Sequence, residues 1–324
     1  MTGSGTAENP YIIMNADDLY SMSTTGSNET YFSLGADIDF NDTDYAENFT
    51  PISLNCKKFD GNGHVIRNVN YSLMEATASM FTVSGADDAS AEITIENLKI
   101  ENIRLSGTSV FLFGNSGGKC NISLTHCTFV LNDITTISTL TATETNKFCL
   151  MHDKNIKIIA DYCTFAVKAS YAKLYACLSW DSISHTQVNI EIDFSSSLSV
   201  GNAYNAICSA SNVSDSYFFM KIRNKSSKTN IDVSSSACIF NHSYFIFQEI
   251  KNISYINWNG NIASACFYDD ELLNQVSESS TVKCDTSYSS NFYALTTQQC
   301  KNAVYLRSIG FNCMEDDEEG GENG

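Results

Sequence analysis

The stretch His126-Cys127-Thr128-Phe129 returns almost unchanged as Tyr162-Cys163-Thr164-Phe165, and this repetition decides the fold. Each copy begins with a polar residue, continues with a small or aliphatic residue and places a β-forming residue two positions later. Related copies are Asn68-Val69-Asn70-Tyr71, Asn97-Leu98-Lys99-Ile100, Glu191-Ile192-Asp193-Phe194, Asp215-Ser216-Tyr217-Phe218 and His242-Ser243-Tyr244-Phe245. The second residues of the seven copies stand at positions 69, 98, 127, 163, 192, 216 and 243, and three of the six steps are 29 residues long. A period of this length predicts a solenoid.

A second column of apolar residues runs between these copies, so each unit holds at least two short strands. Its members are Met80-Phe81, Phe111-Leu112, Phe148-Cys149-Leu150, Ala176-Cys177-Leu178, Ile207-Cys208, Ala237-Cys238-Ile239 and Ala265-Cys266-Phe267. The units are rich in Ile, Val, Phe, Tyr and Thr and are separated by Ser, Asn, Gly and Asp, which is typical of strands joined by turns. Residues 60–270 contain no convincing helical periodicity, which argues against helical or leucine-rich repeats. We therefore expect an all-β parallel β-helix, whose seven or eight coils at roughly 4.8 Å spacing would make a core about 35 Å long.

The two ends differ from the middle and predict short helical caps. Asn15 precedes two acidic residues in the manner of a helix N-cap, and Leu19 and Met22 then share one helical face. A second helical pattern spans residues 296–306, with Cys300, Ala303 and Val304 at helical spacing. Caps of this kind protect the exposed strand edges of a solenoid. We expect an N-terminal cap with the first strands over residues 1–50, β-helix repeats over 51–270, a C-terminal cap over 271–313 and a disordered acidic tail over 314–324.

The twelve cysteines do not have the placement of a disulfide framework. Cys149, Cys177, Cys208, Cys238 and Cys266 fall in one column, and Cys127 and Cys163 in another, so they replace aliphatic residues of other coils. We expect reduced, stacked, interior thiols, in keeping with assembly in a reducing cytoplasm. No C-x-x-C pair occurs and the five histidines are scattered, so we expect neither a metal site nor another cofactor.

Charge and hydropathy argue against several classes of function. The net charge of −18 opposes binding to nucleic acid, because the phosphate contacts that dominate such binding would be repulsive. No run of 18 apolar residues occurs, so we expect no membrane insertion. Neither a phosphate-binding G-x-x-x-x-G-K-[ST] motif nor a nucleophile G-x-S-x-G motif is present.

The N-terminal third resembles the opening of bacterial and bacteriophage proteins with GLUG-type repeats. The resemblance is specific over residues 5–71 and extends to Phe113-Gly114; it rests on residues 5–13, 17–19, 31–40, 49–52 and 59–69. Those proteins resemble pectate-lyase-like right-handed β-helices and serve as adhesins, cell-surface proteins and phage particle components. The resemblance therefore implies a right-handed solenoid with a surface or appendage role. Since the family opening begins almost at Met1, without a signal or anchor, we expect a virion component assembled in the cytoplasm of a bacterial host.

Enzymatic cleavage of polysaccharide is the sharpest alternative, because many right-handed β-helices cleave acidic sugars. Hydrolysis of that kind needs two carboxylates at a defined separation. The candidates are Asp37 with Asp39 on one strand face, and the adjacent pairs Asp17-Asp18, Asp87-Asp88 and Asp269-Asp270. None is distinctive, since helix starts and solvated turns also use such residues, and polygalacturonase-type signatures are absent. We therefore expect no catalytic residues.

Carbohydrate binding without catalysis remains open, with aromatic side chains as its candidates. Trp258 and Tyr255 lie in Tyr255-Ile256-Asn257-Trp258-Asn259-Gly260, and Trp180 follows a strand of the cysteine column. Sugars stack on such rings, but aromatic residues also cover the wall or the interior of a solenoid. The polar neighbours of Trp258 favour an exposed ring.

Together these patterns predict a non-enzymatic structural component of a bacteriophage virion, such as a fibre, tail appendage or head decoration. Its expected partners are other virion structural proteins and a host surface polysaccharide, and we expect a homotrimer by analogy with other fibres. A bacterial cell-surface adhesin of the same fold is the second hypothesis. A polysaccharide-degrading tailspike is the third.

Overall fold

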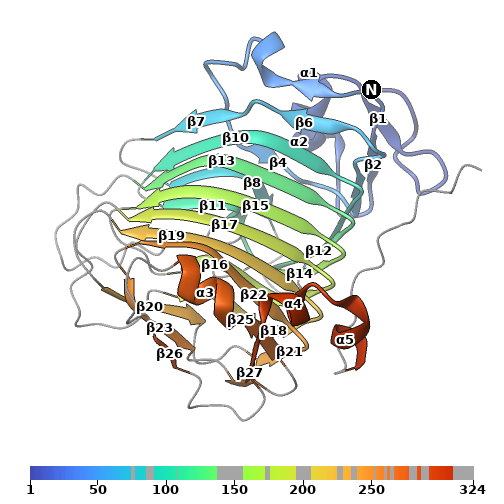
Figure 1. The fold of residues 1–324 in the computed structure, drawn as a ribbon. Coiled ribbons are helices and arrows are strands. Elements are labelled where there is room, and N and C mark those ends of the chain that lie inside the picture. Colours follow the sequence, from blue (N-terminus) through green and yellow to red (C-terminus); the bar gives the residue numbers. More distant parts are fainter. Residues whose placement is uncertain are drawn as a thin grey trace, which may run out of the picture.

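The chain forms an all-β structure whose strands pair in parallel throughout the described residues (Figure 1). This computed structural model describes residues 1–73, 77–84, 91–107, 109–136, 156–171, 176–194, 206–224, 229–234, 239–251, 253–258, 261–262, 266–276, 283–285 and 292–308. One isolated antiparallel bridge joins Thr2 to Ile12. No helix in these ranges is long and apolar enough to cross a membrane.

The strands lie in three sheets. The 13-stranded sheet holds β1 (Tyr11–Ile13), β2 (Tyr31–Leu34), β5 (Lys58–Asp60), β9 (Ala91–Glu96), β12 (Cys120–Thr125), β14 (Ile156–Asp161), β16 (Ala176–Ser184), β18 (Ala206–Ser214), β20 (Thr229–Ser234), β21 (Ile239–Asn241), β23 (Ile253–Trp258), β24 (Asn261–Ile262) and β26 (Lys283–Asp285). The 11-stranded sheet holds β3 (Ile38–Asp39), β6 (Val65–Arg67), β7 (Asn70–Ser72), β10 (Lys99–Gly107), β13 (Thr128–Thr136), β15 (Thr164–Tyr171), β17 (Gln187–Phe194), β19 (Tyr217–Asn224), β22 (Tyr244–Lys251), β25 (Cys266–Asp269) and β27 (Phe292–Leu295). The 3-stranded sheet holds β4 (Ile52–Ser53), β8 (Thr77–Ser84) and β11 (Ser109–Gly117).

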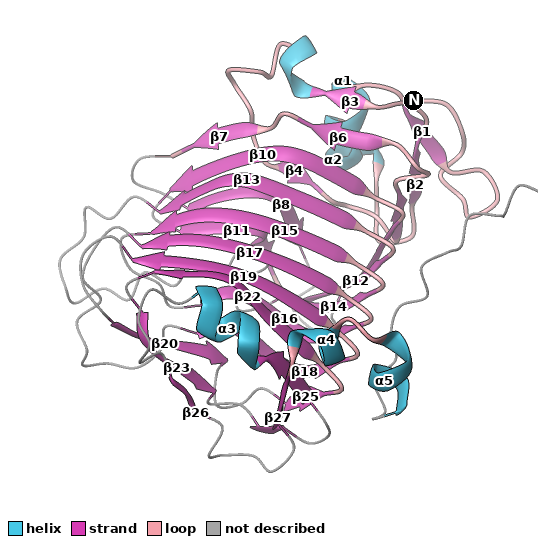
Figure 2. Ribbon diagram, viewed as in Figure 1, coloured by secondary structure: helices cyan, strands magenta, loops and turns pink. Residues whose placement is uncertain are grey.

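Most successive strands of the chain lie in different sheets, and the long strands pair with their equivalents in the next unit. Figure 2 shows the long strands of the 11-stranded sheet stacked one beside another. Because parallel neighbours cannot be joined by a tight hairpin, each unit must leave the sheet and return before the next strand can pair. Strand pairing therefore follows the repeat of the sequence.

Apolar side chains in register build the core. Along the 11-stranded sheet one inward row runs through Ile66, Ile100, Phe129, Phe165 and Val188. The rings of Phe129 and Phe165 are fully buried and stack with centroids 5.3 Å apart and an interplanar angle of 4°. The two nearly identical copies of the repeat thus place their phenylalanines one above the other.

Two-residue connections lead from the 13-stranded sheet into the 11-stranded sheet. Each begins with a residue in the left-handed region, and its second residue is buried. The first residues are Asn97, His126, Tyr162, His185, Asp215 and His242, with φ between 42° and 52°. Such a conformation is unusual for a bulky residue such as Tyr162, and its ring stacks between His126 and His185 at centroid distances of 5.2 and 4.5 Å.

Two members of the predicted column were wrong. Val69 aligns with Ile103 rather than with Leu98, because Arg67 pairs with Glu101 and Asn70 pairs with Arg104. Ile192 pairs with Ala169 in the middle of a strand. The observed column is Leu98, Cys127, Cys163, Thr186, Ser216, Ser243 and Cys266, as the backbone bonds from each following strand show. The unit between Cys163 and Thr186 has only 23 residues, so Thr186 does not fit a period near 29.

The cysteine columns are correct in part. Cys127 and Cys163 are neighbours in one column, and both are buried free thiols. Cys266 belongs to this column. The prediction that Cys266 shares a column with Cys208 was therefore wrong. Cys208 pairs with Leu178, so Cys177 and Cys208 differ by one position and do not share a column. Cys149 and Cys238 lie outside the described residues.

Helices lie at both ends of the stack of strands (Figure 1). The expected N-cap is present: the Asn15 side chain accepts a hydrogen bond from the Asp18 amide at 2.9 Å at the start of α1 (Ala16–Tyr20). Leu19 and Met22 are fully buried, the latter at the start of α2 (Met22–Thr25), and a short 3-10 helix spans Phe40–Asp42. The C-terminal helices are α3 (Asp270–Val276), α4 (Thr297–Cys300) and α5 (Ala303–Ser308). The pattern predicted one helix here, and the structure breaks it at Lys301 and leaves Val304 76% exposed.

Replacing Phe165 with Ala should lower the free energy of unfolding by about 3–5 kcal/mol, because it leaves a cavity beside Phe129. Denaturant unfolding measures the change. Phe219→Ala is the matched control, since Phe219 is on the outward face of β19 and only half-buried. Equal costs for the two substitutions would contradict the inward register.

We expect the described buried thiols to resist labelling in the native protein at pH 8. Burial raises the pKa of Cys56 and of Cys120 to about 12, so little thiolate forms there. Cys300 is half-buried and has its pKa raised to about 11, mainly by burial, so it should react first. Peptide mass spectrometry after alkylation, with and without urea, tests this order. Native labelling of Cys56 as fast as that of Cys300 would contradict it.

Candidate binding groove

The outward face of the 11-stranded sheet carries polar residues in register. Lys168 on β15 aligns with Glu191 on β17, and Glu191 aligns with Lys221 on β19, which aligns with Glu249 on β22. The next outward row runs through Ser170, Asp193, Arg223 and Lys251. Because side chains alternate between the two faces of a strand, inward Ile192 and Ile222 separate these rows.

A shallow groove of about 270 Å³ crosses this face over β13, β15, β17, β19 and β22. Its polar side chains are Asn132, Lys168, Asn189, Glu191, Lys221 and Gln248. Its apolar floor includes Val130, Ala166 and Phe219, which lie in one row with Asn189 between Ala166 and Phe219. An aromatic ring flanked by amides and cations is an arrangement that can hold a polyhydroxylated ligand by stacking and hydrogen bonds.

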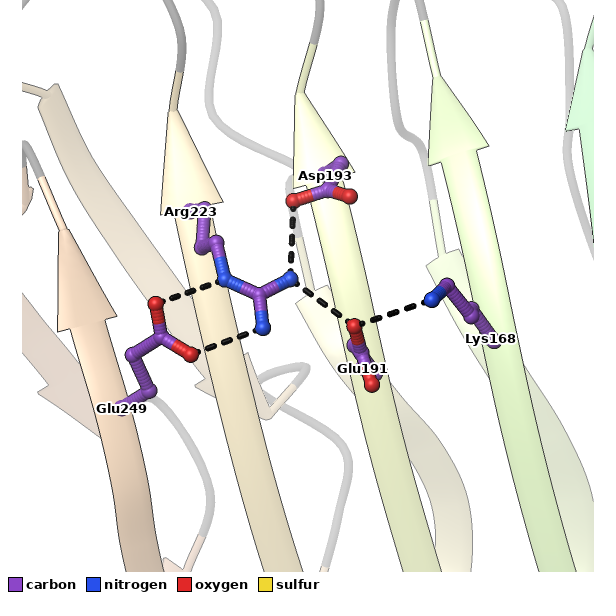
Figure 3. Close-up of polar contacts among 5 residues, drawn as sticks. All are labelled: Lys168, Glu191, Asp193, Arg223 and Glu249. Carbon is purple, nitrogen blue, oxygen red and sulfur yellow. Dashed lines mark hydrogen bonds and ion pairs between the residues drawn. The ribbon is translucent and has the colours of Figure 1, made fainter.

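Arg223 holds three carboxylates beside the groove (Figure 3). Its Nε and Nη2 donate to the two oxygens of Glu249, each at 2.7 Å. Its Nη1 donates to Glu191 Oε1 at 2.9 Å and to Asp193 Oδ1 at 3.2 Å. Lys168 reaches the same oxygen of Glu191 at 3.3 Å. The bidentate pair and the two further bonds fix the guanidinium in the plane of the face.

The cluster keeps Glu191 and Glu249 ionised. The hydrogen bond from Arg223 holds the pKa of Glu191 below its usual value, with a further contribution from Lys168. The same guanidinium lowers the pKa of Glu249. A general acid needs a pKa raised toward neutrality. Glu191 and Glu249 are therefore poorly suited to donate a proton at neutral pH.

The charges around the groove balance locally. Lys168, Lys221 and Arg223 oppose Glu191, Asp193 and Glu249, three cations against three anions. Among the described residues no ion pair engages Lys221, so its ammonium is available at the groove. The groove thus offers hydrogen-bonding groups without a net charge.

The aromatic residues predicted to bind carbohydrate lie on the other large sheet. Trp180 is on β16, where it pairs with Ala210, whereas Tyr255 and Trp258 are on β23. β18 and β20 separate these two strands, so the structure does not bring Trp180 next to Trp258 along the sheet. The side chains of all three lie outside the described part of the chain, and binding there stays a prediction.

The acidic pairs considered for catalysis have structural roles where they are described. Asp39 accepts hydrogen bonds from Asn68, Arg67 and the Asn41 amide, which lower its pKa. The Val65 amide and the His64 side chain lower the pKa of Asp37. Asp269 is 3% exposed and accepts hydrogen bonds from the Leu272 amide and the Thr297 hydroxyl. In the pair at residues 17 and 18, Asp17 accepts a hydrogen bond from the Tyr45 hydroxyl and Asp18 accepts one from the Met14 amide. The pair at residues 87–88 lies outside the described residues.

Sequence reasoning missed the groove. Its members are single polar residues within strands, and no motif marks them. A usable signal was present in the spacing of Lys168, Glu191, Lys221 and Glu249, which alternate in charge across successive units. Reading that alternation requires the register of β17, and the predicted column is wrong there because it contains Ile192 in place of Thr186, six residues too late.

We expect Arg223→Met to destabilise the fold by about 1–2 kcal/mol at pH 7. The loss is modest because the charged cluster is partly exposed, and exposed ion pairs contribute less to stability than buried ones. The lowered pKa values of Glu191 and Glu249 mean that this stabilisation is present above the unfolded carboxylate pKa of about 4.3 and is lost as the pH falls through the lower folded values. Urea unfolding at pH 7 and near pH 3 should therefore show a gap between wild type and variant that closes in acid. Arg104→Met is the control, because Arg104 is exposed on the same sheet and forms no ion pair among the described residues. A gap that is independent of pH would contradict the role assigned to Arg223.

Comparison with known proteins gives one structural likeness. No family model and no curated protein matches the chain. A crystal structure of a Bacteroides ovatus protein, described as a putative immunoglobulin A1 protease, is 15% identical, covers 95% of this chain and 89% of its own, and superposes with a TM-score of 0.41. A likeness at this level carries no conclusion about the chemistry of this chain.

Proposed function

We propose that the chain is a non-enzymatic, rigid scaffold that binds an uncharged polysaccharide in the groove over β13, β15, β17, β19 and β22. The observation that carries the proposal is the composition of this groove, where half-buried Phe219 lies among amides and cations whose charges are balanced by neighbouring acids. The net charge of −18 would repel a polyanion at long range. A neutral chain of sugars avoids this repulsion and can use the hydrogen-bonding groups.

We further propose that the three sheets are the walls of a right-handed parallel β-helix with helical caps. Strands that alternate between sheets and pair in parallel with the next unit support this arrangement. Parallel crossover connections are right-handed in about 98% of cases, which supports the handedness. Such a rod holds groove residues of five strands in fixed register without a lid or hinge.

As the biological setting we propose an exposed component of a bacteriophage particle, assembled as a homotrimer with other virion proteins and attaching to a host surface polysaccharide. The resemblance of residues 5–71 to GLUG-type proteins and the acidic exterior support it. A bacterial cell-surface adhesin would use the same groove. The tailspike alternative is less favoured, since Glu191 and Glu249 are engaged by Arg223 and have lowered pKa values.

A panel of purified polysaccharides tests the binding proposal. We expect retention on a mannan, a β-glucan or a galactan and none on polygalacturonate, measured by affinity electrophoresis and calorimetry. Phe219→Ala should weaken binding at least ten-fold, because it removes the ring that contacts the sugar face. Tyr293→Ala is the control, since Tyr293 is 45% exposed on β27 of the same sheet but is not among the residues that line the groove.

The same incubations distinguish binding from turnover. New reducing ends or unsaturated sugars that accumulate with wild type but not with an Asp37 or Asp39 variant would overturn the non-enzymatic proposal. Binding of polygalacturonate in preference to the neutral chains would overturn the assignment of the ligand. Antibody labelling of purified phage particles or of bacterial surfaces separates the virion from the adhesin.

A further inference from the structure

A line of side-chain hydrogen bonds runs across the outward face from the first strands of the 11-stranded sheet into the groove. Asn68 Nδ2 donates to Asp39 Oδ1 at 2.6 Å, and Asn102 Nδ2 donates to Asn68 Oδ1 at 2.5 Å. Asn132 Nδ2 then donates to Asn102 Oδ1 at 3.2 Å. The four residues belong to successive units, and the line ends at Asn132, which lines the groove. Asp39, Asn68 and Asn102 are half-buried, whereas Asn132 is exposed.

The carboxylate at one end fixes the direction of the line. An ionised carboxylate only accepts hydrogen bonds, whereas an amide has one accepting and one donating end. Asp39 therefore requires the Nδ2 end of Asn68, which leaves Asn68 Oδ1 for Asn102. The same logic makes Asn102 donate to Asn68 and accept from Asn132. Because each amide has used its nitrogen on the preceding unit, the orientation is transmitted without ambiguity.

We propose that this line makes Asn132 a fixed hydrogen-bond acceptor for a sugar hydroxyl in the groove, with Asn68 and Asn102 as positioning residues and Asp39 as the origin of the polarity. Among the described residues Asn132 Oδ1 accepts no hydrogen bond, so the atom is available to a ligand. Asn189, another groove residue, accepts from Gln187 Nε2 through its Oδ1 at 3.2 Å and so presents its Nδ2. One acceptor and one donor in the same groove suit the hydroxyl groups of an uncharged sugar. This inference rests on the proposed function.

Two substitutions at Asn102 separate orientation from mere presence of a side chain. Asn102 has φ 51°, which Gly and Asp both tolerate. Asn102→Gly removes the acceptor that orients Asn132. Asn102→Asp loses the donor to Asn68 but keeps an acceptor for Asn132 Nδ2, so it should preserve the orientation of Asn132. Asn97→Gly is the matched control, because Asn97 has φ 52° and bonds to Asp60 outside the line.

The first measurement needs no ligand. In ¹⁵N-labelled protein the Asn132 side-chain amide protons, assigned by their loss in Asn132→Asp, should exchange slowly with water in wild type, Asn102→Asp and Asn97→Gly. They should exchange faster in Asn102→Gly. Equal exchange in wild type and Asn102→Gly would overturn the proposed orienting role of the hydrogen-bonded line, even if a polysaccharide binds.

The second measurement uses the uncharged polysaccharide retained most strongly in the panel, together with its O-methylated form. We expect Kd to rise about ten-fold in Asn132→Ala and in Asn102→Gly and to stay within about two-fold in Asn102→Asp and Asn97→Gly. Methylation removes hydroxyl donors, so it should weaken binding to wild type more than binding to Asn132→Ala. Equal losses on methylation would overturn the acceptor role. Absence of binding by every uncharged polysaccharide would overturn both the proposed function and the acceptor role of Asn132. The exchange data would still show whether the hydrogen-bonded line orients Asn132.

Discussion

Parallel pairing in register is the constraint on which the rest of the structure depends. Each unit contributes its backbone groups to the units on both sides, so a residue is held opposite its equivalent rather than opposite a hairpin partner. Phe129 and Phe165 can stack with nearly parallel rings because the strands that carry them pair these two residues directly. A core built in this way tolerates units of different length, provided that the strand segments themselves stay aligned.

The same register also orders polar groups in the interior. The column that holds Cys127 and Cys163 continues with Thr186, Ser216 and Ser243. These three hydroxyl-bearing residues are fully buried. A buried hydroxyl without a partner would be costly. Here each bonds to a backbone carbonyl two residues before it, and the hydroxyls of Thr186 and Ser216 also accept from the backbone amide of the preceding column member. A small polar side chain therefore serves the turn as well as a thiol does.

The sequence predicted the parts of the fold that depend on residue type at a local scale. The repeat, the strand-rich units and the cap at Asn15 all follow from local patterns, and the structure agrees with them. The register failed at Val69 and Ile192, since a four-residue pattern inside a strand looks the same as one at a turn. Only the pairing between units distinguishes the two, and that is a long-range property.

The groove shows the limit of prediction from residue types more sharply. The residue types favour tryptophan as a sugar platform because of its ring, whereas the groove proposed for binding is lined by half-buried Phe219 and by amides that have no motif. What defines these amides is their connection: Asn68, Asn102 and Asn132 are separated by 34 and 30 positions and become one hydrogen-bonded line only after β10 and β13 pair. The register of β10 and β13 also shifts next to Asn102, so these asparagines do not recur at a fixed spacing in the sequence.

Rigidity and ionisation together favour recognition over chemistry on this face. Acid–base catalysis requires a group whose pKa is poised near the working pH and whose proton can move in the transition state. Arg223 instead holds Glu191 and Glu249 as anions with several short bonds, and Asp39 is held in the same way by Asn68 and Arg67. Groups fixed so firmly lose little entropy when a ligand arrives, because their orientation is already set by the fold. Preorganised donors and acceptors of this kind suit the proposed sugar ligand, which the face would select by the positions of its hydroxyl groups.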